Sequence, residues 1–541
     1  MTTKRMSLPL PGLLVLLLGA GFAVHLQGRT PTRELQTSAA PSPMPSSTTR
    51  EIDSIDPSGC GRCHSWEVSG YEGSAMSHSM RRGGNEPSGK VEVPGTTIIV
   101  SSSSAGTWHR LESNGETNEY HVDYVVGSGR HASGYLIAIG NHLFQSPIAF
   151  YQSRRRYDLA PGYEGRPDPD FTRAVTPACL FCHSGGSEPV AGTENEYRSP
   201  PFSHLAIGCS RCHGETEAHL VDPKPKTIVN PAKLQGAARD SICEQCHLMG
   251  VARVLNPGKQ FSDFRPGTPL EDTFTIYRND LPPGTASGFR VISHVEQLAL
   301  SMCSRNSSGR LWCGTCHDPH NDPVQPLQFY RSRCLSCHTA AFPKPHPSNN
   351  SNCIGCHMPK REAKDGGHTA FTDHRIQRQP EPERPLSQDI GISAWREPDS
   401  NLQKRNLGIG YIQVGMERRS ATFIIRGYRM LTEVQGTFSA DGDLYSWMGT
   451  ALMLGKQYPE AQRAYARAFA LDPASATKET DLGQAYSSAG EWNAATQYLE
   501  DALAKDNLNL SAATLLMNIY KRQGNAAKAM DLSERVHTAM K

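Results

Sequence analysis

The sequence predicts a mainly α-helical protein in two parts, a loop-rich region with a small β insertion followed by a solenoid of paired helices. Three observations lead to this prediction. The five-residue word Cys-x-x-Cys-His recurs seven times between residues 60 and 357, among loops rich in Gly and Pro. Residues 91–160, between the first two copies, have β character. A helical repeat with a period of 34 residues fills residues 442–541.

Length and composition restrict the classes of protein that fit. A chain of 541 residues is long enough for about two to four domains. Its net charge of +2 argues against a polyanionic partner such as nucleic acid. The apolar share of 37% is low for a globular chain of this length. Part of the interior is therefore expected to be something other than side chains.

The N-terminus has the pattern of an export signal. Lys4 and Arg5 precede an apolar run that ends at Leu26, which is the order of a secretory segment. Residues 1–29 are predicted to be either a cleaved signal peptide or a retained membrane anchor, because the run is close to the length of a membrane span. Residues 30–50, rich in Ser, Thr and Pro, are predicted to be a disordered linker. We therefore expect a periplasmic protein, soluble or anchored to the inner membrane.

The repeated word is the attachment sequence of c-type haem. Its two thiols form thioethers with the porphyrin, and the His that follows binds the iron as the proximal ligand. A zinc site would need Cys pairs that converge in fours, and a redox dithiol would occur once within a βαβ unit. Seven copies, each with His in the fifth position, favour seven covalent haems instead. The predicted covalent ligands are Cys60, Cys63, Cys179, Cys182, Cys209, Cys212, Cys243, Cys246, Cys313, Cys316, Cys334, Cys337, Cys353 and Cys356. The predicted proximal ligands are His64, His183, His213, His247, His317, His338 and His357.

The second axial ligand decides whether an iron is closed or open to a small molecule. The chain has 21 His, of which seven are proximal, and His25 and His537 lie in the leader and the tail. Twelve candidates remain, so bis-His ligation of every haem is permitted but not required. The favoured distal ligands are His78, His131, His219, His294, His320, His368 and His374. The alternative to iron ligation is a surface or hydrogen-bonding role, and it is favoured for His109, His121 and His142. For His204 and His346 the two roles are equally favoured.

The positions of the candidates give reasons for these choices. His320 follows His317 by three residues, too few to loop back to the same iron, so it would serve another haem. His294 lies on a helix predicted over 289–303. Cys303 is the one cysteine outside the motifs and is expected to be a buried thiol.

The domain limits follow from the motifs and the repeats. We predict a heptahaem domain over 51–385, with one small antiparallel sheet inserted at about 91–160. A connector, expected to be helical, covers 386–440, and tetratricopeptide repeats cover 441–541. The residues at the signature positions of the repeats include Gly449, Ala461, Tyr465, Pro473, Gly483, Ala495, Leu516, Tyr520 and Ala529. Asn507, Met517 and Ser533 depart from the signature.

The motif region resembles the multihaem cytochromes of the cytochrome c-554 and hydroxylamine oxidoreductase superfamily, here fused to tetratricopeptide repeats. The residues that carry the resemblance are 208–214 with His219, 313–320, 353–359 and 372–375. It implies haems packed in close pairs with mostly bis-His ligation. The related nitrite reductases hold their catalytic haem on Cys-x-x-Cys-Lys, which this sequence lacks, so that activity is disfavoured.

Electron transfer is favoured over catalysis as the function. The chain would pass electrons between redox protein partners, and the repeats would dock a peptide or protein, act as a structural cap or promote dimerisation. The alternative is an oxidoreductase acting on a small nitrogen or sulfur oxyanion at one open haem, with Arg154, Arg155 and Arg156 as candidates to gather the anion. A scaffold that works only through its repeats is less favoured, since it would not need seven cofactors.

The haem-rich composition yields a first prediction. Residues 51–380 are expected to remain unfolded without haem, because the porphyrins would supply much of the apolar interior. Circular dichroism of the haem-free segment tests this, and a compact apo form would contradict it.

Overall fold

The computed structural model describes residues 59–166, 168–281, 288–338, 352–378 and 390–540. The predicted signal or anchor and the linker, as well as His346, lie outside these residues. Within the described ranges, no helix is long and apolar enough to cross a membrane. Residues 51–541 form one unit by their internal contacts.

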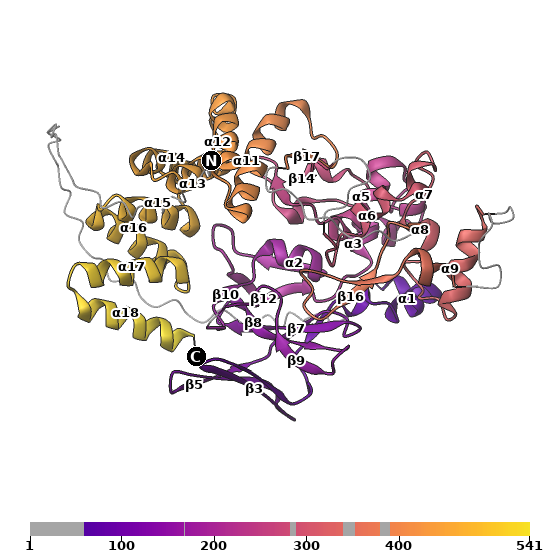
Figure 1. The fold of residues 1–541 in the computed structure, drawn as a ribbon, viewed down its shortest axis with the longest axis horizontal. Coiled ribbons are helices and arrows are strands. Elements are labelled where there is room, and N and C mark those ends of the chain that lie inside the picture. The colour runs from indigo at the N-terminus through magenta and orange to yellow at the C-terminus, as the bar shows by residue number, and fades with distance from the viewer. Residues whose placement is uncertain (1–58, 167, 282–287, 339–351, 379–389, 541) are drawn as a thin grey trace, which may run out of the picture. The chain divides into compact units, whose positions relative to one another are not determined.

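The β structure near the start of the chain consists of two antiparallel sheets (Figure 1). Strands β2, β3, β4 and β5 form a four-stranded meander, and the second sheet has the order β1-β6-β7-β8-β10 with β9 paired to β8. The strands are β1 Met80–Arg82, β2 Gly89–Val93, β3 Thr96–Ser103, β4 Gly106–Ser113, β5 Glu116–His121, β6 Tyr124–Val126, β7 Ala132–Ile139, β8 His142–Tyr151, β9 Arg156–Leu159 and β10 Arg173–Ala174. Asn114 and Gly115 join β4 to β5 with positive φ angles of 54° and 82°, as a tight hairpin turn requires.

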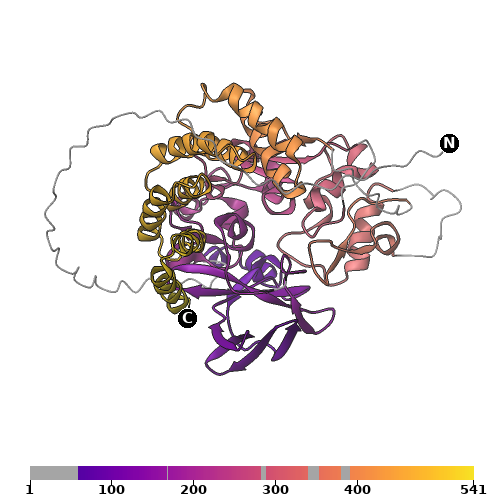
Figure 2. The same cartoon turned by 60° about the vertical axis from the view of Figure 1, so that its left-hand side comes forward.

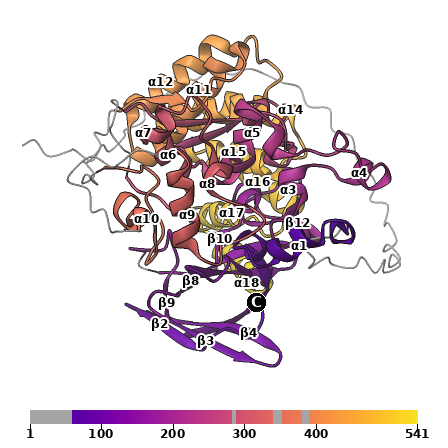
Figure 3. The same ribbon diagram turned by 90° about the vertical axis from the view of Figure 1, so that its right-hand side faces the viewer.

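The two sheets lie side by side (Figure 3) and share one apolar core. Ile98 and Val100 alternate inward along β3, and they belong to the same buried cluster as Tyr135 and Phe144 of the second sheet. The prediction of one small sheet at about 91–160 is therefore wrong in extent, since two sheets span 80–174. The added strands β1 and β10 are two or three residues long, too short for a periodic signal, and become strands by pairing with longer neighbours.

The rest of the motif region is built from short helices and small sheets. The helices are α1 Ser65–Glu72, α2 Pro177–His183, α3 Ser210–His213, α4 Glu217–Val221, α5 Gly236–His247, α6 His294–Leu300, α7 Met302–Arg305, α8 Cys313–Cys316, α9 Pro326–Leu335 and α10 Cys353–His357. The strands are β11 Gly186–Pro189, β12 Tyr197–His204, β13 Ala252–Leu255, β14 Phe274–Asn279, β15 Lys360–Glu362, β16 Ala370–Thr372 and β17 Ile392–Ala394.

The helix predicted over 289–303 is shorter and interrupted. Helix α6 begins only at His294, and the extended backbone of Ser301 separates it from α7. The Ser301 hydroxyl accepts a hydrogen bond from the Ser304 amide, which makes Ser301 the N-cap of α7. Serine favours such caps over helix interiors, which explains the break.

The C-terminal helices form antiparallel pairs (Figure 2). They are α11 Ser400–Arg418, α12 Ala421–Val434, α13 Gly442–Leu454, α14 Tyr458–Leu471, α15 Ala476–Ser488, α16 Trp492–Lys505, α17 Leu510–Arg522 and α18 Ala526–Ala539. The first helices of three successive pairs begin at 442, 476 and 510, and the second helices at 458, 492 and 526, which confirms the 34-residue period.

Side chains with this period determine the packing of the pairs. The N-caps Asp441, Ser475 and Asn509 recur every 34 residues, and each accepts a hydrogen bond from a backbone amide of the helix it begins. A Cβ on Gly449 would lie 2.7 Å from the Tyr465 ring, so only glycine allows that helix pair to approach so closely.

The predicted connector at 386–440 is helical only in part. Its helices α11 and α12 precede the repeats, but β17 at its start pairs with β14 and so belongs to the motif region. Arg405 on α11, 1% exposed, forms an ion pair of 2.8 Å with Asp441 and donates to the backbone carbonyl of Leu255 on β13. This buried guanidinium ties the repeats to the motif region.

The repeats contact the motif region again further along the array. Leu508 and Met540 belong to the core shared by the two large sheets. The Thr477 amide donates to the Gly192 carbonyl at 3.1 Å. The helical part is thus attached to the motif region through α11, and again through residues 477, 508 and 540 of the repeats.

The Arg405–Asp441 pair yields a stability prediction. Arg405→Met leaves the Asp441 carboxylate buried without its partner, so the free energy of unfolding is expected to fall by about 3–5 kcal/mol. Denaturant unfolding followed by circular dichroism measures this. Lys404→Met is the matched control, because Lys404 pairs with Glu433 at the surface, where a salt bridge contributes less than about 1 kcal/mol. Equal effects of the two substitutions would contradict the prediction.

Candidate functional site

The Cys-x-x-Cys-His motifs adopt a common local structure. In four of them the amide of the motif His donates to the carbonyl of the first Cys, at distances between 2.8 and 3.0 Å. These bonds are His64 to Cys60, His213 to Cys209, His317 to Cys313 and His338 to Cys334. Each such motif is therefore one helical turn, and a helical turn brings side chains three residues apart to the same face. The two thiols thus share one face, as attachment to one porphyrin edge requires.

The motifs come together although they are far apart in sequence. Thiols of different motifs are close enough to hydrogen-bond, namely Cys182 with Cys246, Cys243 with Cys313 and Cys334 with Cys353. Cys303 is half-buried rather than fully buried, and burial raises the pKa of its thiol. It lies near Cys316 and Cys337 and so adjoins the fifth and sixth motifs.

Four motif histidines each have a second histidine ring close by within the described residues. The ring centres are 6.4 Å apart for His64 and His219, 5.9 Å for His213 and His320, 5.6 Å for His247 and His294, and 6.2 Å for His317 and His374. Each pair joins a predicted proximal ligand to one of the predicted distal ligands. His294 also lies 4.8 Å from His374, ring centre to ring centre, so two of the pairs adjoin each other.

The separation of these rings can be compared with that of two imidazoles on one iron. An imidazole nitrogen binds a transition metal at about 2 Å. The ring centre lies about 1 Å behind that nitrogen, so two axial imidazoles have ring centres about 6 Å apart. The four observed separations lie close to this value. The donor set therefore fits a six-coordinate haem iron at each of these four motifs.

Hydrogen bonds to backbone carbonyls determine the tautomer of several of these rings. The Nδ1 atom donates to a carbonyl oxygen in His213 (to Val229, 2.8 Å), in His374 (to Thr372, 2.9 Å) and in His357 (to Gln377, 3.0 Å). Because a carbonyl can only accept, the proton is on Nδ1, and Nε2 is the nitrogen that carries the lone pair. Metal-binding histidines are oriented in this way. Sequence reasoning missed these acceptors, since a backbone carbonyl leaves no trace in the side-chain pattern.

Burial keeps these imidazoles neutral. It lowers the pKa of His294 to about 3 and that of His374 to about 4, with the nearby histidines adding repulsion. The Nδ1 atom of His294 is buried and has no hydrogen-bond partner. A neutral imidazole with an unused nitrogen is the form that binds a metal.

The other three predicted distal ligands have different surroundings. His78 donates from Nδ1 to the Ser74 carbonyl at 3.0 Å and lines a cavity of about 420 Å³. The His131 ring contacts Phe371, with ring centres 4.5 Å apart. The Nε2 atom of His368 is bound to the carboxylate of Asp158 at 2.8 Å, which occupies the nitrogen that would otherwise face an iron. Their role as ligands stays a prediction.

The less favoured histidines have hydrogen-bond partners. His109 bonds Ser146 at 2.9 Å, His121 bonds Asp123 at 3.0 Å and His142 bonds Asp506 at 2.7 Å. Two of the three arginines in the run 154–156 also have an acidic neighbour, since Arg154 and Arg156 each lie 3.9 Å from the Asp158 carboxylate. That carboxylate reduces the attraction of the run for an anion.

Comparisons with known proteins cover only part of the chain. No protein-family model matches it, and no curated protein does. A crystal structure of MamA aligns with 26% of this chain and 79% of its own, at 19% identity and a TM-score of 0.24. MamA from Desulfovibrio magneticus RS-1 aligns with 25% of this chain and 75% of its own, at 18% identity and a TM-score of 0.23. The second TPR domain of human RPAP3, in complex with an HSP70 peptide, aligns with 22% and 93%, at 23% identity and a TM-score of 0.20. These scores carry no argument, and the helical repeat rests on the period of the chain itself.

Proposed function

We propose that the protein is an exported heptahaem c-type cytochrome that relays electrons between redox proteins. The observation that carries this proposal is the pairing of four motif histidines with four histidines outside the motifs at about the separation of two axial ligands. A motif that only bound zinc or formed a dithiol would not require a second imidazole opposite its own.

The residues of the chain have three tasks in this proposal. The fourteen motif thiols would hold the haems covalently, and the motif histidines would each bind an iron. His219, His320, His294 and His374 would supply a second ligand to four of the irons, and a substrate would then have no place at these four sites. Haem supplies an iron centre that exchanges one electron between the ferric and ferrous states.

The close approach of the motifs supports a relay. The thiol contacts join the second motif to the fourth, the fourth to the fifth, and the sixth to the seventh. His213 is also near His64, so the first and third motifs adjoin. Attachment points that adjoin in this way would keep the haems within each of these groups a short distance apart.

The oxyanion-reducing alternative has less support. Arg81, in the cavity beside His78, is paired with Glu86 at 2.7 Å, and Arg154 and Arg156 of the arginine run each lie 3.9 Å from Asp158. A pocket built to bind an anion would leave its guanidinium groups available.

The repeats have a structural role and, we propose, a docking role. Their turns and first helix pack on the motif region. The repeats carry exposed apolar side chains such as Met530 on α18, 72% exposed, which would offer a contact to a peptide or a redox partner. The N-terminal segment would deliver the protein to the periplasm.

The ligand assignment is tested by changing one distal histidine. In the oxidised holoprotein, His219→Ala should convert one low-spin haem to high spin, because its iron loses the second imidazole. Electron paramagnetic resonance measures the change, and added imidazole should reverse it. His121→Ala is the control, since His121 bonds Asp123 away from the motif pairs. An unchanged low-spin signal in His219→Ala would contradict the assignment.

The docking role is tested by removing residues 442–541. The truncated cytochrome should still be reduced by a small soluble reductant, but reduction by a membrane fraction of its own host should slow. Stopped-flow absorbance of the haems measures both rates. Equal rates with the membrane fraction for the truncated and full chains would rule out docking through the repeats.

A further inference from the structure

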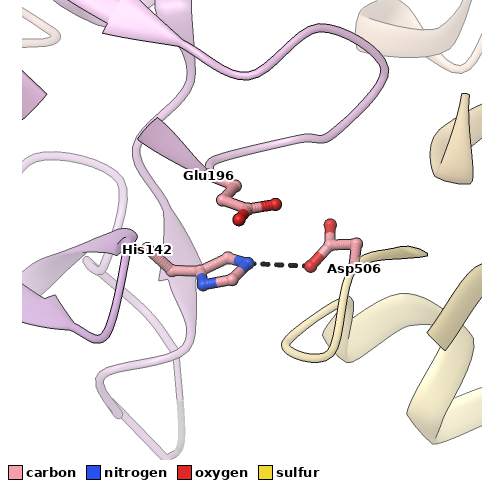
Figure 4. A group of neighbouring side chains, drawn as sticks. All are labelled: His142, Glu196 and Asp506. Atoms are coloured by element: carbon pink, nitrogen blue, oxygen red, sulfur yellow. Dashed lines mark hydrogen bonds and ion pairs between the residues drawn. The ribbon is translucent and has the colours of Figure 1, made fainter. Parts of the chain in front are cut away.

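A cluster of three ligand-type side chains lies where the repeats contact the motif region (Figure 4). His142 begins β8, Glu196 immediately precedes β12, and Asp506 follows the last residue of α16. One ligand atom from each lies within 4.8 Å of those of the other two. Residue 506 is far from the other two in sequence, so the cluster exists only when the repeats pack on the motif region.

The surrounding backbone holds the motif-region side of the cluster in place. His142 and Glu196 face each other across an antiparallel bridge. The Tyr197 amide donates to the Asn141 carbonyl at 2.8 Å, and the Leu143 amide donates to the Asn195 carbonyl at 3.1 Å. These hydrogen bonds bring the two side chains to one side of the bridge, where Figure 4 shows them directed toward Asp506.

Asp506 is buried, and one of its two carboxylate oxygens has no hydrogen-bond partner among the described residues. The side chains of His142 and Asp506 are 3% and 0% exposed. The Oδ1 atom of Asp506 bonds Nε2 of His142 at 2.7 Å, but its Oδ2 atom is buried and has no hydrogen-bond partner. A buried carboxylate oxygen without a partner is costly, and a bound cation would satisfy it.

We propose that His142, Glu196 and Asp506 bind a divalent cation, Zn²⁺ in the first instance, which fastens the repeats to the motif region. One imidazole and two carboxylates form a donor set that zinc accepts, with water in the fourth position. On binding, Zn²⁺ takes the place of the proton on Nε2 of His142, and the neutral ring carries its one proton on Nδ1 instead.

The geometry requires only a small adjustment. Two ligands of one zinc ion are no more than about 4 Å apart, because each bond is about 2 Å long. The ligand atoms of the three side chains lie within 4.8 Å of one another, so the longest separation has to shorten by about 1 Å. Glu196 is half-buried and has a flexible side chain, so it can supply this movement. The site is separate from the motif histidines and does not depend on the haem proposal.

The experiment uses the full-length holoprotein after treatment with EDTA, which does not remove covalently held haem. Isothermal titration with ZnCl₂ should show one site per chain. Glu196→Gln should weaken binding at least tenfold and keep the His142–Asp506 hydrogen bond, so the fold is preserved. Asp531→Asn is the control, because it removes one charge from the exposed surface of α18 and should leave the affinity unchanged.

A second measurement links the ion to the contact between the two regions. Zn²⁺ should slow proteolysis of the turns between the repeats in the wild type and not in Glu196→Gln or Asp506→Asn. If Zn²⁺ does not bind, or if Glu196→Gln binds it as tightly as the wild type, the proposal is wrong. In that case the contact is a hydrogen bond between His142 and Asp506 without a metal.

Discussion

In the motif region, the proposed haem sites depend on one geometric constraint, the separation of paired imidazoles. For two histidines to serve one iron, their ring centres have to lie about 6 Å apart. His64 and His219 meet this condition across more than a hundred intervening residues, which include all the strands of the two large sheets. The constraint gives a reason for the short helices and loops of this region, because the chain has to return repeatedly to the same few places.

Buried charges at the turns of the repeats join the two parts of the chain. Asp441 is the N-cap of α13 and also the partner of Arg405, while Asp506 follows α16 and bonds His142. Each carboxylate is buried and needs its partner, which is Arg405 on α11 for Asp441 and His142 on β8 for Asp506. Arg405 in turn donates to the Leu255 carbonyl of the motif region. The packing of the repeats on the motif region thus depends on the residues that end and begin the repeat helices. The repeats are therefore part of the fold of the whole chain, in addition to the docking role proposed for them.

Elements with a strong local signal were predictable. The period of the repeats appears in the structure at the same positions, because small residues at Gly449 and at Ala461 are required wherever two helices approach closely. The β insertion was recognised but its extent was not, since β1 and β10 are strands only through their neighbours. The helix predicted over 289–303 begins later and is divided in two, because Ser301 caps a second helix, α7, and apolar spacing does not report such a cap.

The sequence by itself determined the motifs, the set of histidines that could face them and the helical repeat, because each is a local pattern of residue types. Only the tertiary structure decided which histidine lies opposite which motif, since His219, His294, His320 and His374 reach their partners through long-range packing. It also decided that His368 turns to Asp158 and that His142 meets Asp506. Such pairings depend on how far apart chain segments lie in space. The spacing of residues along the chain does not specify that distance.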